Sequence, residues 1–269
     1  MTAPAVPETV EPLKYPDHTH LPYEPGDRTL PFRPLPDHKQ LPDKDGSFVR
    51  NTQEPFQSAL LTESLLPVLG RLHPDEDYFI GLDTGLYWRI IEPPLRGVKA
   101  PDWFLVRGVP HLLNGEMRRS YVMWQEFIAP QLILEYASGN GSEERDRTPW
   151  EGKLWVYEQV VRPAFYGIFT WETGRLEMFH LLEQRLEPMS PNEHGRFPIR
   201  PLEVELGVWR GRYAAFEAPW LRWWDAAGNL IPTPGERAEQ AGRQAEQARQ
   251  QAERLAAKLR ALGVDPEQP

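Results

Sequence analysis

The stretch PQLILEYASGNGSEERDRTPWEGKLWVYEQ, residues 130–159, holds two signals that decide the fold. Leu132, Ile133 and Leu134 form an apolar run between a proline and a Ser-Gly-Asn-Gly turn, which predicts a buried strand. Glu135 stands at the end of this run, where a carboxylate is seldom buried without a partner. We therefore expect a strand that carries a paired or metal-bound glutamate.

The second half of the stretch predicts a helix. Residues 148–151 (TPWE) have the capping-box pattern with proline at the first helical position, so the helix is expected from Pro149 to about Val161. Lys153 lies one turn into this helix, and Tyr157 shares its face four residues later. This spacing allows the lysine to return toward the glutamate strand.

The segments on either side predict an α/β core. Residues 52–72 carry apolar side chains at spacings of three and four, which indicates an amphipathic helix. Strands are expected at residues 78–91, 99–108, 131–138 and 164–172. The expected order is helix, three strands, helix, strand.

Further β structure is expected after this core. Thr173-Gly174 indicates a hairpin turn, and residues 201–232 predict short strands with a second hairpin around Gly228-Asn229. A cluster of tryptophans in this region suggests either a base-stacking platform or structural packing, and the scarcity of basic residues beyond Arg222 favours packing; its members are Trp220, Trp223 and Trp224.

A heptad pattern predicts a long C-terminal helix. Its apolar positions alternate at spacings of three and four: Ala238, Ala241, Ala245, Ala248, Ala252, Leu255, Leu259 and Leu262. Thr233 and Glu236 form a capping box at its start. Because the seam is mostly alanine, which buries little area, we expect a weak coiled coil and a homodimer, with a solitary solvated helix as the alternative.

These patterns divide the chain into five parts. Residues 1–45 are a Pro-rich, extended N-terminal arm, residues 46–200 the α/β domain, and residues 201–232 a β extension packed on it. Residues 233–263 are the heptad helix and residues 264–269 a tail.

Composition limits the classes of function. No run of 18 apolar residues occurs in the 269, so we expect no membrane span. The absence of cysteine excludes disulfides and thiolate metal sites and fits a cytoplasmic location. A net charge of −9 argues against nucleic-acid binding by bulk electrostatics, so any such role needs a local basic groove or bound cations.

Three acidic residues lie in or beside strands that we expect to be neighbours: Asp83, Asp102 and Glu135. If Asp102 and Glu135 converge, two carboxylates and waters make a site for Mg²⁺, with Mn²⁺ as the alternative ion. Lys153 would then position a metal-bound water for attack on phosphorus. From spacing alone, these residues also fit a set of unrelated surface or ion-paired groups.

The motifs GLDTGLYW, APDWFLVRGV, SYVMWQE, APQLILEYAS and EGKLWVYEQ, with the heptad tail closing in RALGVDPE, carry a family resemblance. Over most of residues 40–265 the chain resembles the Uma family, whose restriction-endonuclease-like members are placed in the PD-(D/E)XK nuclease superfamily. The resemblance implies a mixed central sheet and a Mg²⁺-dependent endodeoxyribonuclease. It implies Asp102 as the PD aspartate, Glu135 as the strand glutamate, Lys153 as a lysine moved onto the next helix, and Asp83 as a secondary ligand.

One loop departs from the family pattern. The family often continues the glutamate strand as Ser-Pro-Ser, whereas this chain has a long charged loop after Glu135. Arg145 and Arg147 in this loop, with Tyr157, are candidate DNA contacts, and the alternative is a solvated loop. Two other functions stay open: a non-catalytic binding module with a nuclease fold, and a glycosidase using two carboxylates.

Overall fold

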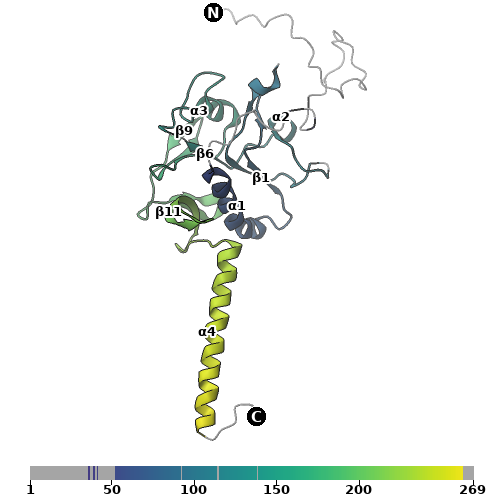
Figure 1. The fold of residues 1–269 in the computed structure, drawn as a ribbon. Helices are drawn as coiled ribbons and strands as arrows, with labels where there is room; N and C mark the ends of the chain where they lie inside the picture. The colour runs from purple at the N-terminus through teal and green to yellow at the C-terminus, as the bar shows by residue number, and fades with distance from the viewer. Residues whose placement is uncertain are drawn as a thin grey trace, which may run out of the picture.

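The computed structural model describes residues 52–91, 93–113, 115–137 and 139–262, together with Pro36, Lys39 and Leu41. Six strands of this part form one mixed sheet in the order β1-β4-β6-β7-β8-β9 (Figure 1). Strands β6 and β7 run parallel, and the other neighbours in this sheet are antiparallel. The bounds are β1 Tyr78–Leu82, β4 Trp103–Arg107, β6 Leu132–Ala137, β7 Phe165–Thr170, β8 Arg175–Leu182 and β9 Arg185–Pro188.

Alternating side chains of the central strands divide the core between the two faces of this sheet. Trp103 and Leu105 of β4 pack with Leu61 and Leu65 of helix α1, which spans Gln53–Leu72. A second sheet of β10 (Phe197–Ile199), β11 (Val204–Tyr213) and β12 (Phe216–Asp225) covers the same face. The short helix η4 (Arg200–Leu202) connects β10 to β11.

The other face is covered by a helix that changes character midway. Leu154 and Val156 of α3, which spans Lys153–Val156, pack on Phe104 and Ile133. The helix continues as a π-helical turn, η3, over Tyr157–Val161. A three-stranded sheet, with the short helices η2 and α2, lies beside it: β2 Leu86–Tyr87, η2 Pro94–Gly97, β3 Val98–Lys99, β5 Tyr121–Val122 and α2 Met123–Glu126.

The predicted order of helix, three strands, helix and strand is confirmed, and so is the mixed sheet. Some predicted boundaries are wrong. The segment 78–91 contains two strands, because the backbone turns at Asp83 with a φ of 43°. The main turn of the C-terminal β structure lies at Ala214-Ala215 between β11 and β12, while a small bridge from Trp224 to Leu230 closes the turn at Gly228.

The predicted helix start at Pro149 is also wrong. Thr148 does not cap the helix, because its hydroxyl donates to Asp146 Oδ1 at 2.6 Å. Trp150 has a φ of 68°, which is incompatible with a right-handed helix, and the helix begins at Lys153 with Gly152 as its N-cap. A Cβ on Gly152 would lie 2.4 Å from the Asp146 carbonyl oxygen, so this tight turn requires glycine.

The tryptophans of β12 are packing residues, as expected. Trp220 and Trp223 are fully buried, and Trp224 is nearly so. Trp223 Nε1 donates to the Leu61 carbonyl of α1 at 2.9 Å, which ties the second sheet to the first helix. The region therefore offers no stacking surface for bases at these positions.

Three residues of the N-terminal arm are described, and all of them contact the domain. Trp124 Nε1 donates to the Pro36 carbonyl at 3.0 Å, Lys39 pairs with Glu116 at 2.8 Å, and Leu41 packs in a small apolar cluster. The remaining arm and the predicted tail lie outside the described residues.

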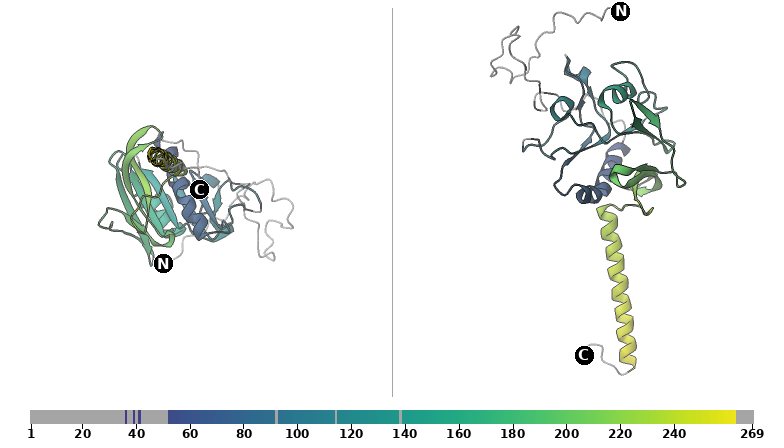
Figure 2. Two further views of the ribbon diagram at one scale, coloured as in Figure 1. Left: turned by 90° about the horizontal axis from the view of Figure 1, so that it is seen from below. Right: turned by 180° about the vertical axis from the view of Figure 1, so that it is seen from behind.

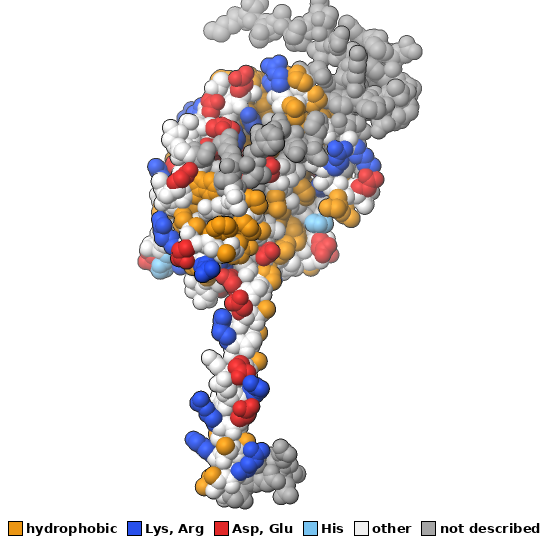
Figure 3. All heavy atoms as spheres, in the orientation of Figure 1, with side chains coloured by type: hydrophobic (Ala, Val, Ile, Leu, Met, Phe, Trp, Pro, Cys, Tyr) orange, Lys and Arg blue, Asp and Glu red, His pale blue; other side chains and the backbone are white. Residues whose placement is uncertain are grey.

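Helix α4, Pro234–Ala261, projects from the body like a stalk (Figures 1 and 2). The predicted capping box is present: Thr233 Oγ1 accepts from Glu236 N, and Glu236 Oε2 accepts from Thr233 N. The base of the helix is fixed by buried Arg222, which donates to both carboxylate oxygens of Glu236 at 3.0 and 2.7 Å. No residue of α4 is buried, and side chains of both charges line the helix (Figure 3).

Candidate active site

Two neighbouring strands place Asp102 and Glu135 at one edge of the mixed sheet. Trp103 of β4 is paired with Leu134 of β6 in an antiparallel register, so Asp102 and Glu135 stand opposite each other one step beyond the pair. Residues that lie opposite in such a register share a face. Asp102 Oδ2 also accepts a hydrogen bond from the amide of Tyr136, at 2.5 Å, which holds the aspartate against β6.

Helix α3 and η3 bring Lys153 and Tyr157 onto Glu135. Lys153 Nζ donates to Glu135 Oε2 at 2.9 Å, and the Tyr157 hydroxyl donates to Glu135 Oε1 at 2.6 Å. The Glu135 side chain is fully buried, and that of Lys153 is 15% exposed. The helix therefore satisfies both oxygens of the strand glutamate, which answers the burial problem that the apolar strand raised.

The loop between β6 and α3 adds two more carboxylates. Glu143 Oε1 and Glu144 Oε1 each lie 3.7 Å from Lys153 Nζ, and Glu144 is nearly fully buried. The loop is held in place by Arg145, which pairs with Glu177 of β8 and donates to the Asn140 and Gly141 carbonyls. Despite its departure from the family pattern, this loop lets Lys153 reach Glu135.

Helix α1 touches the other side of the site. Ser58 Oγ donates to the Asp102 carbonyl at 3.3 Å and lies 3.1 Å from the Tyr136 hydroxyl. The charge of Glu54, one helical turn before Ser58, acts on Asp102. Neither Glu54 nor Glu144 was predicted from the sequence; the one available signal was the i, i+4 spacing of Glu54 and Ser58.

The carboxylates crowd one another electrostatically. Burial and the nearby charge of Glu135 raise the pKa of Asp102 well above its usual range, although the Tyr136 amide and Lys153 oppose the rise. Burial alone would lower the pKa of Lys153, but the charges of Glu135 and Asp102 outweigh it and raise that pKa. Lys153 is therefore held as a cation among several acidic groups.

The tyrosines around Glu135 stay neutral. Burial, followed by the charge of Glu135, raises the pKa values of Tyr157 and Tyr166 well above the usual range. Their rings pack at 5.1 Å between centroids, and the Tyr166 hydroxyl donates to the Glu144 carbonyl at 2.9 Å. The two rings form an apolar wall behind the carboxylates.

The donor set fits a hard divalent cation that keeps most of its waters. Across the described residues, no group of three or more His, Cys, Asp or Glu side chains is arranged as a metal site. Mg²⁺ in proteins is often held by one or two carboxylates, with waters and phosphate oxygens completing its coordination. Asp102 and Glu135 supply such a pair; burial first and then the charge of Glu135 raise the pKa of Asp102, and a bound cation would oppose both effects.

Of the other predicted site residues, Tyr157 contacts this group, and the side chains of the remaining three lie outside it. Asp83 is exposed, and its amide donates to the Asp102 carbonyl at 3.3 Å. Arg147 pairs with Glu158 at 2.6 Å, and Arg145 pairs with Glu177. Tyr157 was predicted as a DNA contact; this is wrong, because the side chain is fully buried and its hydroxyl is bound to Glu135.

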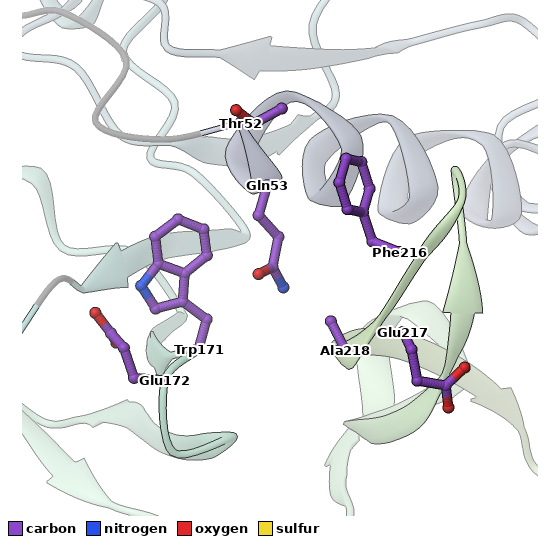
Figure 4. Close-up of a pocket in the computed structure, with 7 residues that line it drawn as sticks. All are labelled: Thr52, Gln53, Trp171, Glu172, Phe216, Glu217 and Ala218. Atoms are coloured by element: carbon purple, nitrogen blue, oxygen red, sulfur yellow. The ribbon is translucent and has the colours of Figure 1, made fainter.

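A separate pocket of about 470 Å³ opens between the start of α1, the β7–β8 turn and the β11–β12 turn (Figure 4). Its lining is mainly apolar with two acidic side chains: Thr52, Gln53, Trp171, Glu172, Phe216, Glu217 and Ala218. Asp102 and Glu135 do not line this pocket, so the carboxylate site and the pocket are distinct features of the molecule.

The comparison with known families shows the family to which the chain belongs. The model of Uma2, a family described as putative restriction endonucleases, matches residues 35–217, which is more than half of the chain. The chain belongs to the Uma2 family. This confirms the resemblance read from the motifs around Asp102, Glu135 and Lys153, all of which lie within the matched range.

This Uma2 protein also has a distant likeness to a solved structure. It is similar to a crystal structure of a putative nuclease belonging to DUF820 from Anabaena variabilis ATCC 29413, at 12% identity and a TM-score of 0.41. The likeness covers 64% of this chain and 95% of that one. No curated protein matches the sequence.

A membrane span was not expected from the sequence. Among the described residues, every helix is too short or too polar to cross a bilayer.

Proposed function

We propose that this Uma2 protein is a Mg²⁺-dependent endodeoxyribonuclease that hydrolyses phosphodiester bonds in DNA. The observation that carries the proposal is the group of Asp102, Glu135 and Lys153, in which the aspartate before β4 and the glutamate of β6 meet a helix lysine at one sheet edge. Membership of a family of putative restriction endonucleases supports the same reading.

Each residue has a distinct role in this proposal. Asp102 and Glu135 would hold the ion, with Mn²⁺ as an alternative and Asp83 as a further candidate ligand. When bound, Mg²⁺ supplies charge stabilisation and lowers the pKa of a coordinated water. Lys153 orients the attacking water and offers a positive charge to the phosphoryl oxygens, while Tyr157 fixes the rotamer of Glu135 through its hydrogen bond.

DNA would approach from the side of the β6–α3 loop. The Arg147 side chain is 54% exposed, so its guanidinium can contact a phosphate while it pairs with Glu158; Arg145, which is 30% exposed, is the weaker candidate. Because the net charge is −9, metal ions at the carboxylates would also reduce repulsion of the phosphate backbone. We propose a cytoplasmic location, which the lack of cysteine favours.

The proposal is tested by cleavage of supercoiled plasmid, linear duplex and single-stranded DNA in Mg²⁺, Mn²⁺ or EDTA. We expect metal-dependent cutting by the wild type and a loss of at least about 100-fold in Glu135→Ala, because removing a metal ligand removes several kcal/mol of charge stabilisation. Glu187→Ala, which changes an exposed glutamate on β9, is the matched control. The proposal fails if wild type and Glu135→Ala cut equally, or if neither cuts any DNA.

A second function, a non-catalytic DNA-binding or protein-interaction module, is favoured by one observation. Both Glu135 oxygens are already engaged, by Lys153 and Tyr157, so metal entry must compete with these bonds. Isothermal titration with Mg²⁺ separates the two functions. Millimolar or tighter binding that is lost in Asp102→Asn supports the nuclease, and no binding supports the module.

We further propose that a second copy of the chain pairs along α4. The seam ends in Leu255 and Leu259, which are 54% and 38% exposed on a helix without buried residues. Light scattering after size exclusion should give a concentration-dependent dimer, and Leu255→Glu/Leu259→Glu should give a monomer. Arg243→Gln, outside the seam, should leave the dimer intact; a monomeric wild type at high concentration contradicts this proposal.

A further inference from the structure

A strained and exposed tryptophan lies in the loop that ends at Lys153. Trp150 is three residues before Lys153, and its side chain is 53% exposed. Its φ of 68° falls in the left-handed region, which is unfavourable for a bulky residue. Such strain is unfavourable and often marks a functional position.

Two other tryptophans hold the Trp150 ring in place. Trp155 of α3 packs against it with 4.8 Å between ring centroids, and Trp88 stacks beside it at 6.4 Å with planes inclined by 21°. Trp88 is buried, whereas Trp150 presents part of its surface to solvent. We call Trp88, Trp150 and Trp155 the tryptophan platform.

Cations surround this platform. The Arg89 guanidinium carbon lies 4.7 Å from the Trp88 ring centroid and 5.4 Å from that of Trp150. Burial, and next the charge of Arg96, lowers the pKa of Arg89, while the charge of Glu151 opposes this shift, so a second guanidinium and one carboxylate act on Arg89. Lys99 Nζ donates to the Glu151 carbonyl at 2.7 Å, beside Trp150 in the chain.

Two buried donors in the platform have no acceptor. In the part of the chain that the structure describes, Trp88 Nε1 and Arg89 Nε lack a hydrogen-bond partner. A buried donor without an acceptor is unfavourable unless a ligand or a rearrangement satisfies it. The donors and the surrounding cations favour an anionic partner that is rich in acceptor atoms.

We propose that the tryptophan platform stacks an unpaired base of the DNA strand that enters the Asp102–Glu135 site, so that the enzyme prefers DNA with single-stranded or frayed segments. The inference rests on the proposed nuclease function. Base stacking supplies the contact with the exposed Trp150 face, and Arg89, Arg96 and Lys99 attract the flanking phosphates. An intact duplex cannot make this contact, because its internal bases already stack on their neighbours.

The chemistry of the platform distinguishes it from the pocket in Figure 4. That pocket is also apolar, with Trp171 and Phe216 in its wall, but it carries the acidic side chains of Glu172 and Glu217. Acidic groups repel phosphates, whereas arginine and lysine attract them. The charge of Glu151 also acts near the platform, but Arg89, Arg96 and Lys99 outnumber it, so a nucleic-acid strand matches the platform better than the pocket.

Fluorescence anisotropy in EDTA, where the proposed metal-dependent cleavage is blocked, tests the inference on the full chain. The probes are a fluorescein-labelled 12-mer single strand, the same strand with abasic sites in place of its bases, and a blunt duplex. We expect the wild type to bind the base-bearing strand most tightly. Trp150→Ala should weaken that binding by about 5-fold to 100-fold, with little change for the abasic strand.

Substitutions at Trp150 separate stacking from simple apolar contact. Trp150→Phe keeps an aromatic face and should retain affinity within a few-fold, whereas Trp150→Leu keeps apolar bulk without a π face and should behave like Trp150→Ala. Phe127→Ala, which removes an aromatic side chain that is 82% exposed, is the matched control and should bind like the wild type. Circular dichroism and thermal melts establish that each variant is folded.

Three results would overturn the inference: wild-type affinity in Trp150→Ala, equal losses on base-bearing and abasic strands, or no binding of any strand by the wild type. The outcome is separable from that of the proposed function. Trp150-dependent binding of the base-bearing strand without Glu135-dependent cleavage would support the platform and contradict the nuclease function. Glu135-dependent cleavage by a protein indifferent to Trp150 would do the reverse.

Discussion

Two buried ion pairs in this molecule look alike but differ in charge balance. Arg222 is fully buried and pairs with Glu236 through two hydrogen bonds, while the Ile231 carbonyl accepts a third. Lys153 and Glu135 are also buried, but Glu143, Glu144 and Asp102 crowd the same cation. The first pair is balanced, and the second carries excess negative charge.

The difference separates a pair that fixes geometry from a group whose excess negative charge a further cation would balance. A pair with one positive and one negative charge can fix geometry without attracting a further ion, and Arg222–Glu236 fixes the start of α4. An unbalanced group is unfavourable by itself and gains stability from a further cation. We therefore expect added metal to affect the stability of the second pair and not that of the first.

The largest effect is expected when the cation of the unbalanced group is removed. Lys153→Met leaves Glu135 buried without its ammonium partner, and we expect a loss of about 3–5 kcal/mol in the free energy of unfolding. Millimolar Mg²⁺ should restore part of this loss, because an ion that binds the folded state alone stabilises it. Urea denaturation with Mg²⁺ or EDTA measures both values, with Lys258→Met as control; an absence of rescue would contradict the metal assignment.

Removing the cation of the balanced pair should be nearly as damaging but insensitive to metal. Arg222→Met removes both hydrogen bonds that arginine donates to Glu236. We expect a loss of about 3 kcal/mol in the free energy of unfolding, at the lower end of the range for a broken buried ion pair, because Glu236 is 39% exposed. The same urea titrations apply. If Mg²⁺ rescues this variant as it rescues Lys153→Met, the distinction between the pairs is wrong.

A smaller effect is expected at the hydroxyl that holds Glu135. Tyr157→Phe removes the 2.6 Å hydrogen bond but keeps the ring, and we expect a loss of about 1.5–3 kcal/mol, typical of a bond to a charged group. Cleavage should slow with the Mg²⁺ requirement shifted, since Glu135 loses one of its two positioning contacts. Tyr213→Phe, on a tyrosine of β11 outside the site, is the control; unchanged stability in Tyr157→Phe would contradict the buried contact.

The smallest effect is expected at Asp102, because solvent reaches part of its side chain. Burial and Glu135 raise its pKa in the folded state, so the folded protein holds the proton more tightly than the unfolded chain. The contribution of Asp102 to stability is then fully present below the unfolded pKa near 4 and is lost as pH rises through the folded pKa.

It follows that Asp102→Asn should be more stable than the wild type at pH 8 in EDTA. At pH 4, where the wild-type aspartate is protonated, the two proteins should differ little. Thermal melts at the two pH values measure this. A variant that is less stable than the wild type at pH 8 would show that Asp102 is not held against excess negative charge.

The parts of this fold that follow from the sequence are those set by local pattern. The apolar run Leu132–Leu134 predicts β6, and the Thr233–Glu236 spacing predicts the start of α4, because apolar runs and capping act over a few residues. The convergence of Asp102 and Glu135 was predicted from adjacent strands, and the structure brings them together at one sheet edge.

What could not be predicted depends on contacts between distant segments. The capping box at Thr148 fails because Asp146 competes for the threonine hydroxyl, a choice that the pattern alone does not reveal. Tyr157 was assigned to DNA since it shares a helix face with Lys153, but this face turns inward onto Glu135. The neighbours Glu54 and Glu144 come from a helix and a loop whose placement requires the tertiary fold.

The direction of α4 has a consequence for how two copies would meet a duplex. The helix leaves the body at the end opposite α3 and, with 28 residues, reaches about 42 Å (Figure 1). If the proposed dimer and the proposed nuclease function hold, parallel pairing would set the two bodies at the same end of the helix pair, where both could act on one DNA segment. Antiparallel pairing would hold them at the two ends of a rod, so that each body would nick a separate segment.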